Sequence, residues 1–184
     1  MKILSIPNEN GKMTCFWEEG ASSGKKPLII CLADKEEDAQ RDLNLLFSQA
    51  NGASVAALVI YPQTEEQIVG DWLYSLRQRE DVDENRITLT GTLSAADWVW
   101  RLGSHFPQWF AGICAVGGYG DPYEVRAMKN VPVRAYLVEE EPQIIRKGKV
   151  AVNVDQLVMS LLTAGSECVE MYGVLPLGFL PLAI

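Results

Sequence analysis

The chain has 184 residues, 48% hydrophobic and 22% charged, a composition typical of one folded domain with a substantial core. Its 16 basic and 24 acidic residues give a net charge of −8. This composition excludes a largely disordered chain. The acidic net charge and the lack of a basic stripe argue against nucleic-acid binding. No apolar run in the sequence approaches the ~18 residues of a membrane-spanning helix.

The first half of the chain begins with a hairpin and continues with buried strands that alternate with helices. The strand-like runs Met1–Pro7 and Lys12–Glu18 flank an Asn-Gly step, which is typical of a tight hairpin turn. The continuous apolar runs Pro27–Ala33 and Ser54–Tyr61 indicate strands buried on both faces. Helical apolar spacing follows each of these runs, at Leu43, Leu46, Phe47 and Ala50 and then at Ile68, Val69, Trp72, Leu73 and Leu76.

The second half repeats this alternation. Strands are predicted at Arg86–Thr90, Ala111–Val116, Val131–Val138 and Glu167–Tyr172. Helices are predicted through Trp98, Leu102 and Phe106, briefly around Val125–Met128, and over Val154–Leu162. Buried strands alternating with helices require parallel pairing with crossover helices on both faces. We therefore predict a single domain over residues 1–184, a three-layer α/β/α sandwich whose mostly parallel sheet has about eight strands and an antiparallel N-terminal hairpin.

Two scarce residue types restrict the chemistry. The single histidine, His105, excludes a metal site built from several histidines, and no cofactor motif is present. The four cysteines, at positions 15, 31, 114 and 168, are scattered without C-x-x-C spacing. Cys31 and Cys114 lie in apolar strand-like runs, where a thiol behaves as a small hydrophobic group. Reduced thiols, and an N-terminus without the apolar core of a secretory signal, predict a cytoplasmic protein.

Three stretches resemble esterases of the feruloyl-esterase, poly-hydroxybutyrate-depolymerase and predicted-peptidase type. VDENRITLTG (82–91) resembles the D-x-x-R-I-x-L-x-G approach to their nucleophile. FPQWFAGICAVGGYGDP (106–122), which follows Trp100, resembles their segment from the elbow helix into the next strand. NVPVRAYLVEEEP (130–142) resembles the segment that carries their catalytic acid. The resemblance extends from about Pro27 to Tyr172 and implies an α/β-hydrolase fold.

The same resemblance implies that the catalytic positions have changed. In the register set by the strand before the turn and by Trp100 after it, the nucleophile position is Leu93, and its flanking glycines are replaced by Ala95 and Ala96. Small flanking residues would still permit the strained strand-to-helix turn. No titratable residue follows Tyr172, where the histidine is expected, and Ala33-Asp34 replaces the His-Gly pair near the oxyanion donors. The acid position keeps an acid, Glu141.

Four further groups have both a functional and a structural interpretation. Ser94 is an alternative nucleophile, but with Asp97 it has the spacing of a helix capping box, which we favour. His105 is expected to be a polar residue at a helix end rather than a proton shuttle. The run Glu139–Glu141 is expected to be a solvated loop rather than a catalytic pair. Asp34 and Glu36–Asp38 are interpreted as acids at a helix N-terminus rather than a metal site.

These residues predict one crevice at the carboxyl ends of the strands. The residues expected to line it are Ala33, Asp34, Leu93, Ser94, Tyr119, Asp121 and Glu141. Its apolar centre and acidic rim predict a neutral or cationic ligand. Two functions follow: a catalytically inactive hydrolase-fold protein that binds an unknown small molecule or protein, or a weak carboxylic-ester hydrolase that uses Ser94.

The C-terminal segment 174–184 is uncharged and rich in leucine, and Pro176 and Pro181 prevent a regular helix. Burying its apolar side chains would release about 1.5–3 kcal/mol for each one fully buried. We therefore expect this segment to pack as extended chain, against its own sheet or in the contacts of a homodimer.

Overall fold

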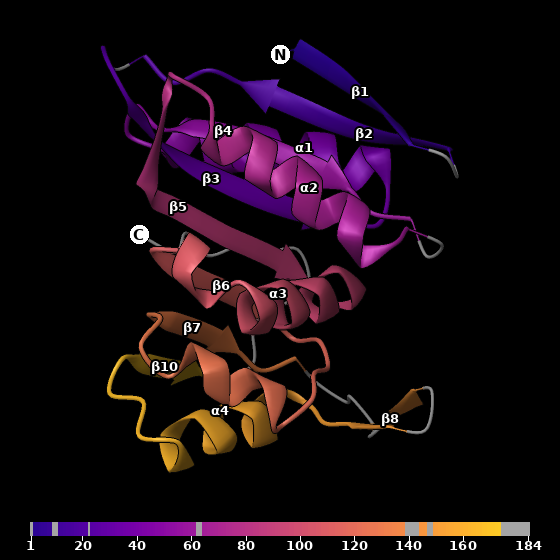
Figure 1. Cartoon of the computed structure of the whole chain (residues 1–184), viewed down its shortest axis with the longest axis vertical. Helices are drawn as coiled ribbons and strands as arrows, with labels where there is room; N and C mark the ends of the chain where they lie inside the picture. The colour runs from indigo at the N-terminus through magenta and orange to yellow at the C-terminus, as the bar shows by residue number, and fades with distance from the viewer. Residues whose placement is uncertain are drawn as a thin grey trace. The chain divides into compact units, whose positions relative to one another are not determined.

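The computed structural model describes residues 2–8, 11–21, 23–61, 64–138, 144–146 and 149–173 (Figure 1). Its residues divide into two compact units, Met1–Ile87 and Thr88–Ile184. Each unit combines strands with helices.

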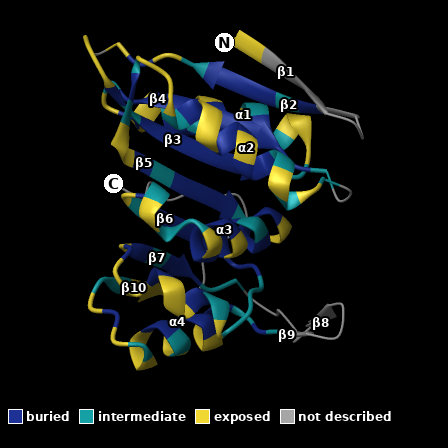
Figure 2. Cartoon of the chain, in the orientation of Figure 1, coloured by how far each residue is buried: buried dark blue, intermediate teal, exposed yellow. Residues whose placement is uncertain are grey.

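The first unit contains the predicted hairpin and two buried strands. Strand β1 (Lys2–Asn8) pairs antiparallel with β2 (Gly11–Glu18), and β2 pairs antiparallel with β4 (Ser54–Val59). β4 in turn lies parallel to β3 (Lys26–Ala33). Helix α1 (Glu36–Gln49) follows β3, and helix α2 (Glu66–Arg77) follows β4. All six residues of β4 are buried, as the continuous apolar run predicted, whereas both helices show exposed residues on one side (Figure 2).

The second unit continues the alternation with parallel strands. Strand β5 (Val82–Thr92) enters this unit and pairs with β6 (Gly112–Val116), which pairs with β7 (Val133–Tyr136). β7 pairs in parallel with β10 (Val169–Tyr172). Helix α3 (Ser94–His105) follows β5, and α4 (Val154–Thr163) precedes β10. The remaining elements are the short 3₁₀ helices η1 (Pro107–Trp109) and η2 (Glu124–Met128) and a small antiparallel pair, β8 (Ile144–Arg146) with β9 (Lys149–Ala151).

The strand order β1-β2-β4-β3-β5-β6-β7-β10 defines an eight-stranded mixed sheet with the antiparallel hairpin at one edge. The predicted α/β class, strand number and hairpin are therefore confirmed. Two details differ. β5 begins at Val82 rather than Arg86, because Val82 is buried while the charged residues after it extend into solvent. β8 and β9 were not predicted, because strands of three residues are too short to give a periodic signal.

Candidate functional site

The turn between β5 and α3 has an unusual backbone conformation. β5 ends at Thr92 and α3 begins at Ser94, so Leu93 is the single residue between them. Leu93 has φ 53° and ψ −123° and is one of two described non-glycine residues with positive φ; the other is Asn51. Asparagine tolerates positive φ, whereas leucine adopts it at a cost of about 1–3 kcal/mol. Leu93 is nevertheless 42% exposed, so its side chain gains little from burial in return.

Neighbouring backbone groups hold this turn in place. The Leu93 N–H donates to the carbonyl oxygen of Val116 at 2.8 Å, and the Ala96 N–H donates to the Leu93 oxygen at 2.9 Å. A side chain at Gly91 would not fit, since a Cβ there would lie 2.9 Å from Cγ2 of Val99. The small flanking residues therefore permit the sharp strand-to-helix turn, as the sequence predicted.

Ser94 does not cap the helix. The cap position belongs to Leu93, whose side chain makes no capping hydrogen bond, and Ser94 is the first residue of α3. The predicted capping box is therefore wrong. Asp97 instead accepts a hydrogen bond from the backbone N–H of Tyr119, with 2.6 Å between that nitrogen and Oδ1. Because Asp97 is only 5% exposed, this carboxylate joins the first turn of α3 to the loop after β6.

The loop Gly117–Asp121 is fixed by its contacts with α3 and β7. Gly118 has φ +86°, and a Cβ there would lie 2.7 Å from Cβ of Ala96, so only glycine fits. The indole N–H of Trp100 donates to the Gly117 oxygen at 3.1 Å, and the Gly117 N–H donates to the Tyr136 oxygen at 2.9 Å. The glycines of this loop thus permit its close approach to α3.

The predicted crevice residues are distributed as follows. Leu93, Ser94, Tyr119 and Asp121 lie in the second unit, on the turn and on the loop that Asp97 fixes to α3. Asp121 also accepts backbone hydrogen bonds from Tyr123 and Glu124, at 2.8 and 3.4 Å. Ala33 ends β3 in the first unit and Asp34 follows it, while Glu141 and the run Glu139–Glu141 lie outside the described residues. A single crevice that contains all seven residues stays a prediction.

His105 lies at the far end of α3 from Leu93. It is the last residue of this 12-residue helix, which at 1.5 Å per residue is about 18 Å long. Its Nε2 atom is 3.4 Å from Oε2 of Glu124. The structure therefore places the histidine at a helix end, as the sequence predicted, and also beside Glu124, which the sequence did not predict.

Two of the buried thiols, Cys15 and Cys114, are not activated nucleophiles. The four cysteines are thiols and not disulfides. Cys31 and Cys114 are buried, as expected for the apolar runs, and Cys15 is buried as well. Burial raises the pKa of Cys15 to about 12 and that of Cys114 to about 11. Both thiols are therefore protonated at neutral pH, and only a thiolate reacts readily.

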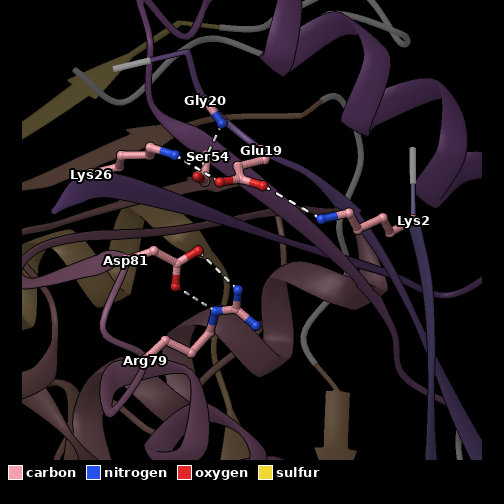
Figure 3. Close-up of polar contacts among 7 residues, drawn as sticks. All are labelled: Lys2, Glu19, Gly20, Lys26, Ser54, Arg79 and Asp81. Carbon is pink, nitrogen blue, oxygen red and sulfur yellow. Dashed lines mark hydrogen bonds and ion pairs between the residues drawn. The ribbon is translucent and has the colours of Figure 1, made fainter. Parts of the chain in front are cut away.

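A separate cluster of charged side chains lies in the first unit (Figure 3). The ammonium group of Lys26, only 10% exposed, is 2.8 Å from the Glu19 carboxylate, which also pairs with Lys2 at 3.4 Å. Arg79 donates two 2.9 Å hydrogen bonds to Asp81, and its guanidinium lies 4.6 Å from the centre of the Trp17 ring. Each charge in this cluster has an opposite partner, so the cluster fixes loops rather than offering charge to a ligand.

The acids after β3 belong to helix α1. Glu36, Glu37 and Asp38 occupy its first turn, where the helix dipole favours negative charge. The Glu36 carboxylate accepts hydrogen bonds from Thr14 and Tyr61, and Asp38 pairs with Arg41. Over the described ranges, no three metal-ligating side chains gather in an arrangement suited to a metal ion. No helix in those ranges is long and apolar enough to cross a membrane.

Comparisons with known proteins identify the fold. No family model and no curated protein matches the sequence. Among solved structures, a thermostable esterase superposes with a TM-score of 0.72 at 17% identity, covering 94% of this chain and 54% of its own. A putative dienelactone hydrolase from Klebsiella pneumoniae subsp. pneumoniae MGH 78578 gives 0.68 at 18% identity, covering 94% of this chain and 84% of its own. Carboxyl esterase 2 from the mycorrhizal fungus Tuber melanosporum superposes with a TM-score of 0.63 at 13% identity, covering 94% of this chain and 75% of its own.

The chain therefore has the α/β-hydrolase fold. It spans about half the length of the thermostable esterase. Enzymes with this fold present their nucleophile on a sharp strand-to-helix turn.

Proposed function

We propose that this chain is a hydrolase-fold protein that does not catalyse hydrolysis and instead binds a ligand or a protein partner at the surface around Leu93. The observation that carries the proposal is the conformation of Leu93. The chain keeps a strained turn whose use in hydrolases is to present a hydroxyl, and it presents a hydrocarbon there. A leucine side chain cannot attack a carbonyl, but an exposed one can contact an apolar group.

The surroundings of the turn support the same proposal. The only histidine of this chain lies at the other end of α3, beyond the reach of a proton transfer at Ser94 or Leu93. The loop that Asp97 fixes to α3 in the same unit carries another carboxylate, Asp121, which favours a neutral or cationic ligand over an anionic one.

The alternative is a weak ester hydrolase that uses Ser94, which is exposed beside the tip of the turn. A fluorophosphonate probe separates the two proposals, because it labels only activated serines. We expect no labelling of the wild-type chain above that of Ser94→Ala. Labelling that is lost in Ser94→Ala and retained in the control Ser48→Ala, another exposed serine, would establish the hydrolase instead.

The binding part of the proposal has its own test. NMR of the Leu93 methyl groups, titrated with neutral p-nitrophenyl butyrate and separately with butyrate, reports contact at the turn. We expect shifts with the neutral ester, none with the carboxylate, and loss of the shifts at the surrounding residues in Leu93→Ala. Equal shifts with both compounds would contradict the proposed ligand class.

A further inference from the structure

Strand β10 is the last in the strand order and has one strand neighbour, β7, in the part of the chain that the structure describes. Three of its four residues are exposed, among them Met171 at 48% and Tyr172 at 40%. Helix α4, which packs near it, also exposes Met159 and Leu162. Strand β10 and helix α4 therefore both present apolar side chains to solvent.

The hydrogen bonds to β7 determine which backbone groups of β10 face outward. The carbonyl oxygens of Cys168 and Tyr172 accept hydrogen bonds from the N–H groups of Val133 and Leu137, at 2.9 and 3.2 Å. Because the direction alternates along a strand, Val169, Met171 and Gly173 direct their N–H and C=O groups away from β7. Such a row of outward groups is a template for pairing with another strand.

The opposite edge of the sheet is protected, whereas β10 is not. The other terminal strand, β1, carries Lys2 and also Pro7, which has no N–H to donate. Lysine and proline are the residues with which edge strands prevent pairing. β10 reads Val-Glu-Met-Tyr and contains neither. The two edges thus differ in the chemistry that controls association.

We propose that β10 pairs antiparallel with β10 of a second copy of this chain, about a two-fold axis at Met171. In this register Met171 lies opposite Met171 of the second copy, and Val169 lies opposite Gly173. The outward groups of these residues would form about six hydrogen bonds between the copies. The contact is isologous, so it closes at a dimer rather than growing into a fibre.

The side chains fit this register. Glu170 lies opposite Tyr172 of the second copy, a carboxylate facing a phenol. Within one chain the same two groups already form a 2.6 Å hydrogen bond, and Arg134 lies 3.2 Å from the Glu170 carboxylate. A two-fold axis at Glu170 would instead place two carboxylates directly opposite each other, which is unfavourable. Tyr172 is also oriented by stacking on Tyr136, with 4.8 Å between ring centres.

Disulfide trapping tests the register directly. In a Cys168→Ser background, Met171→Cys would place two sulfurs across a hydrogen-bonded pair whose Cα atoms are about 5.5 Å apart, within the range of a disulfide. Glu170→Cys is the matched control, since its two copies would be about 8 Å apart. We expect rapid covalent dimerisation of the first variant on mild oxidation and little of the second. Equal cross-linking of both, or of neither, would overturn the register.

Sedimentation of the full chain over a micromolar to near-millimolar series tests the dimer itself. We expect a species of twice 20.4 kDa. Met171→Pro removes only an outward N–H and should weaken dimerisation by about tenfold or more, whereas Ile3→Lys on the protected edge should not. A monomer at every concentration would overturn the proposal. So would a dimer that survives Met171→Pro but is lost on deleting residues 174–184, because that segment would then be the contact.

Discussion

The charged cluster of the first unit and the turn at Leu93 in the second differ in whether their residues are favourably placed for stability. Around Glu19, Lys26, Arg79 and Asp81 each charge is paired, and a cation stacks on an aromatic ring. At the turn, a leucine adopts a positive φ and exposes its side chain. The cluster is explained by stability alone. The turn is not, because an ordinary turn would avoid both the strain and the exposed hydrocarbon.

This difference indicates that the turn at Leu93, and not the charged cluster, is the candidate functional region. Strained backbone persists when the surrounding structure imposes it, and here Val116, Gly91 and Gly118 do so. The turn is therefore strained and presents a hydrocarbon side chain, which is the basis of the binding proposal. Four predictions sharpen this contrast, from the largest expected effect to the smallest.

Gly118→Ala should be the most damaging change. Its Cβ would clash with the backbone of α3 at 2.8 Å, in addition to the positive φ. We expect the free energy of unfolding to fall by about 3 kcal/mol in urea denaturation. Gly165→Ala is the control, because Gly165 has φ +89° and nothing within 4 Å, so only the backbone cost of about 1 kcal/mol applies. Equal losses would show that the loop does not depend on its approach to α3.

Arg79→Lys tests whether the charged cluster stabilises the first unit. Lysine keeps the charge but loses the paired hydrogen bonds to Asp81 and the stacking on Trp17. We expect a loss of about 1–2 kcal/mol in thermal or urea unfolding. Arg86→Lys, at an exposed pair with Asp83, should cost less than half as much. A harmless Arg79→Lys would mean that the cluster is not what stabilises this region.

Substitutions at position 93 measure the strain. Leu93→Gly should be more stable than Leu93→Ala by about 1 kcal/mol, since only glycine adopts positive φ without penalty. At the exposed position 101 of α3 the order should reverse, with Arg101→Ala more stable than Arg101→Gly by about 1 kcal/mol. If alanine were the more stable residue at both positions, the turn would be unstrained.

Two aspartates should give pH dependences of opposite sign. The hydrogen bonds from Arg79 hold the pKa of Asp81 below its usual 3.8, so its stabilisation is present above that pH and is lost as the pH falls further. Burial raises the pKa of Asp42, so its contribution to stability falls as the pH rises above 3.8. In Asp81→Asn, the free energy of unfolding should therefore rise less steeply with increasing pH in the acid range than in the wild-type chain. In Asp42→Asn it should rise more steeply. Urea denaturation from acid to neutral pH measures both slopes.

The sequence predicted the eight strands of the large sheet and the four α-helices because their apolar periodicity is local, and it predicted a turn at Leu93 because Trp100 fixes the spacing. It did not predict the role of Asp97. Whether that carboxylate caps α3 or binds the loop after β6 depends on where Tyr119 lies, 22 residues further along the chain. The conformation of Leu93 likewise depends on the carbonyl of Val116. Long-range partners decide such details, and spacing along the chain does not encode them.

The most direct test of the central claim is the turnover of a p-nitrophenyl ester by the wild-type chain, Ser94→Ala and Leu93→Ser. We predict that all three match the buffer rate, because a restored hydroxyl still has no histidine beside it, and triad members act as a unit. Saturable turnover by the wild-type chain that disappears in Ser94→Ala would contradict the account and make this protein an esterase.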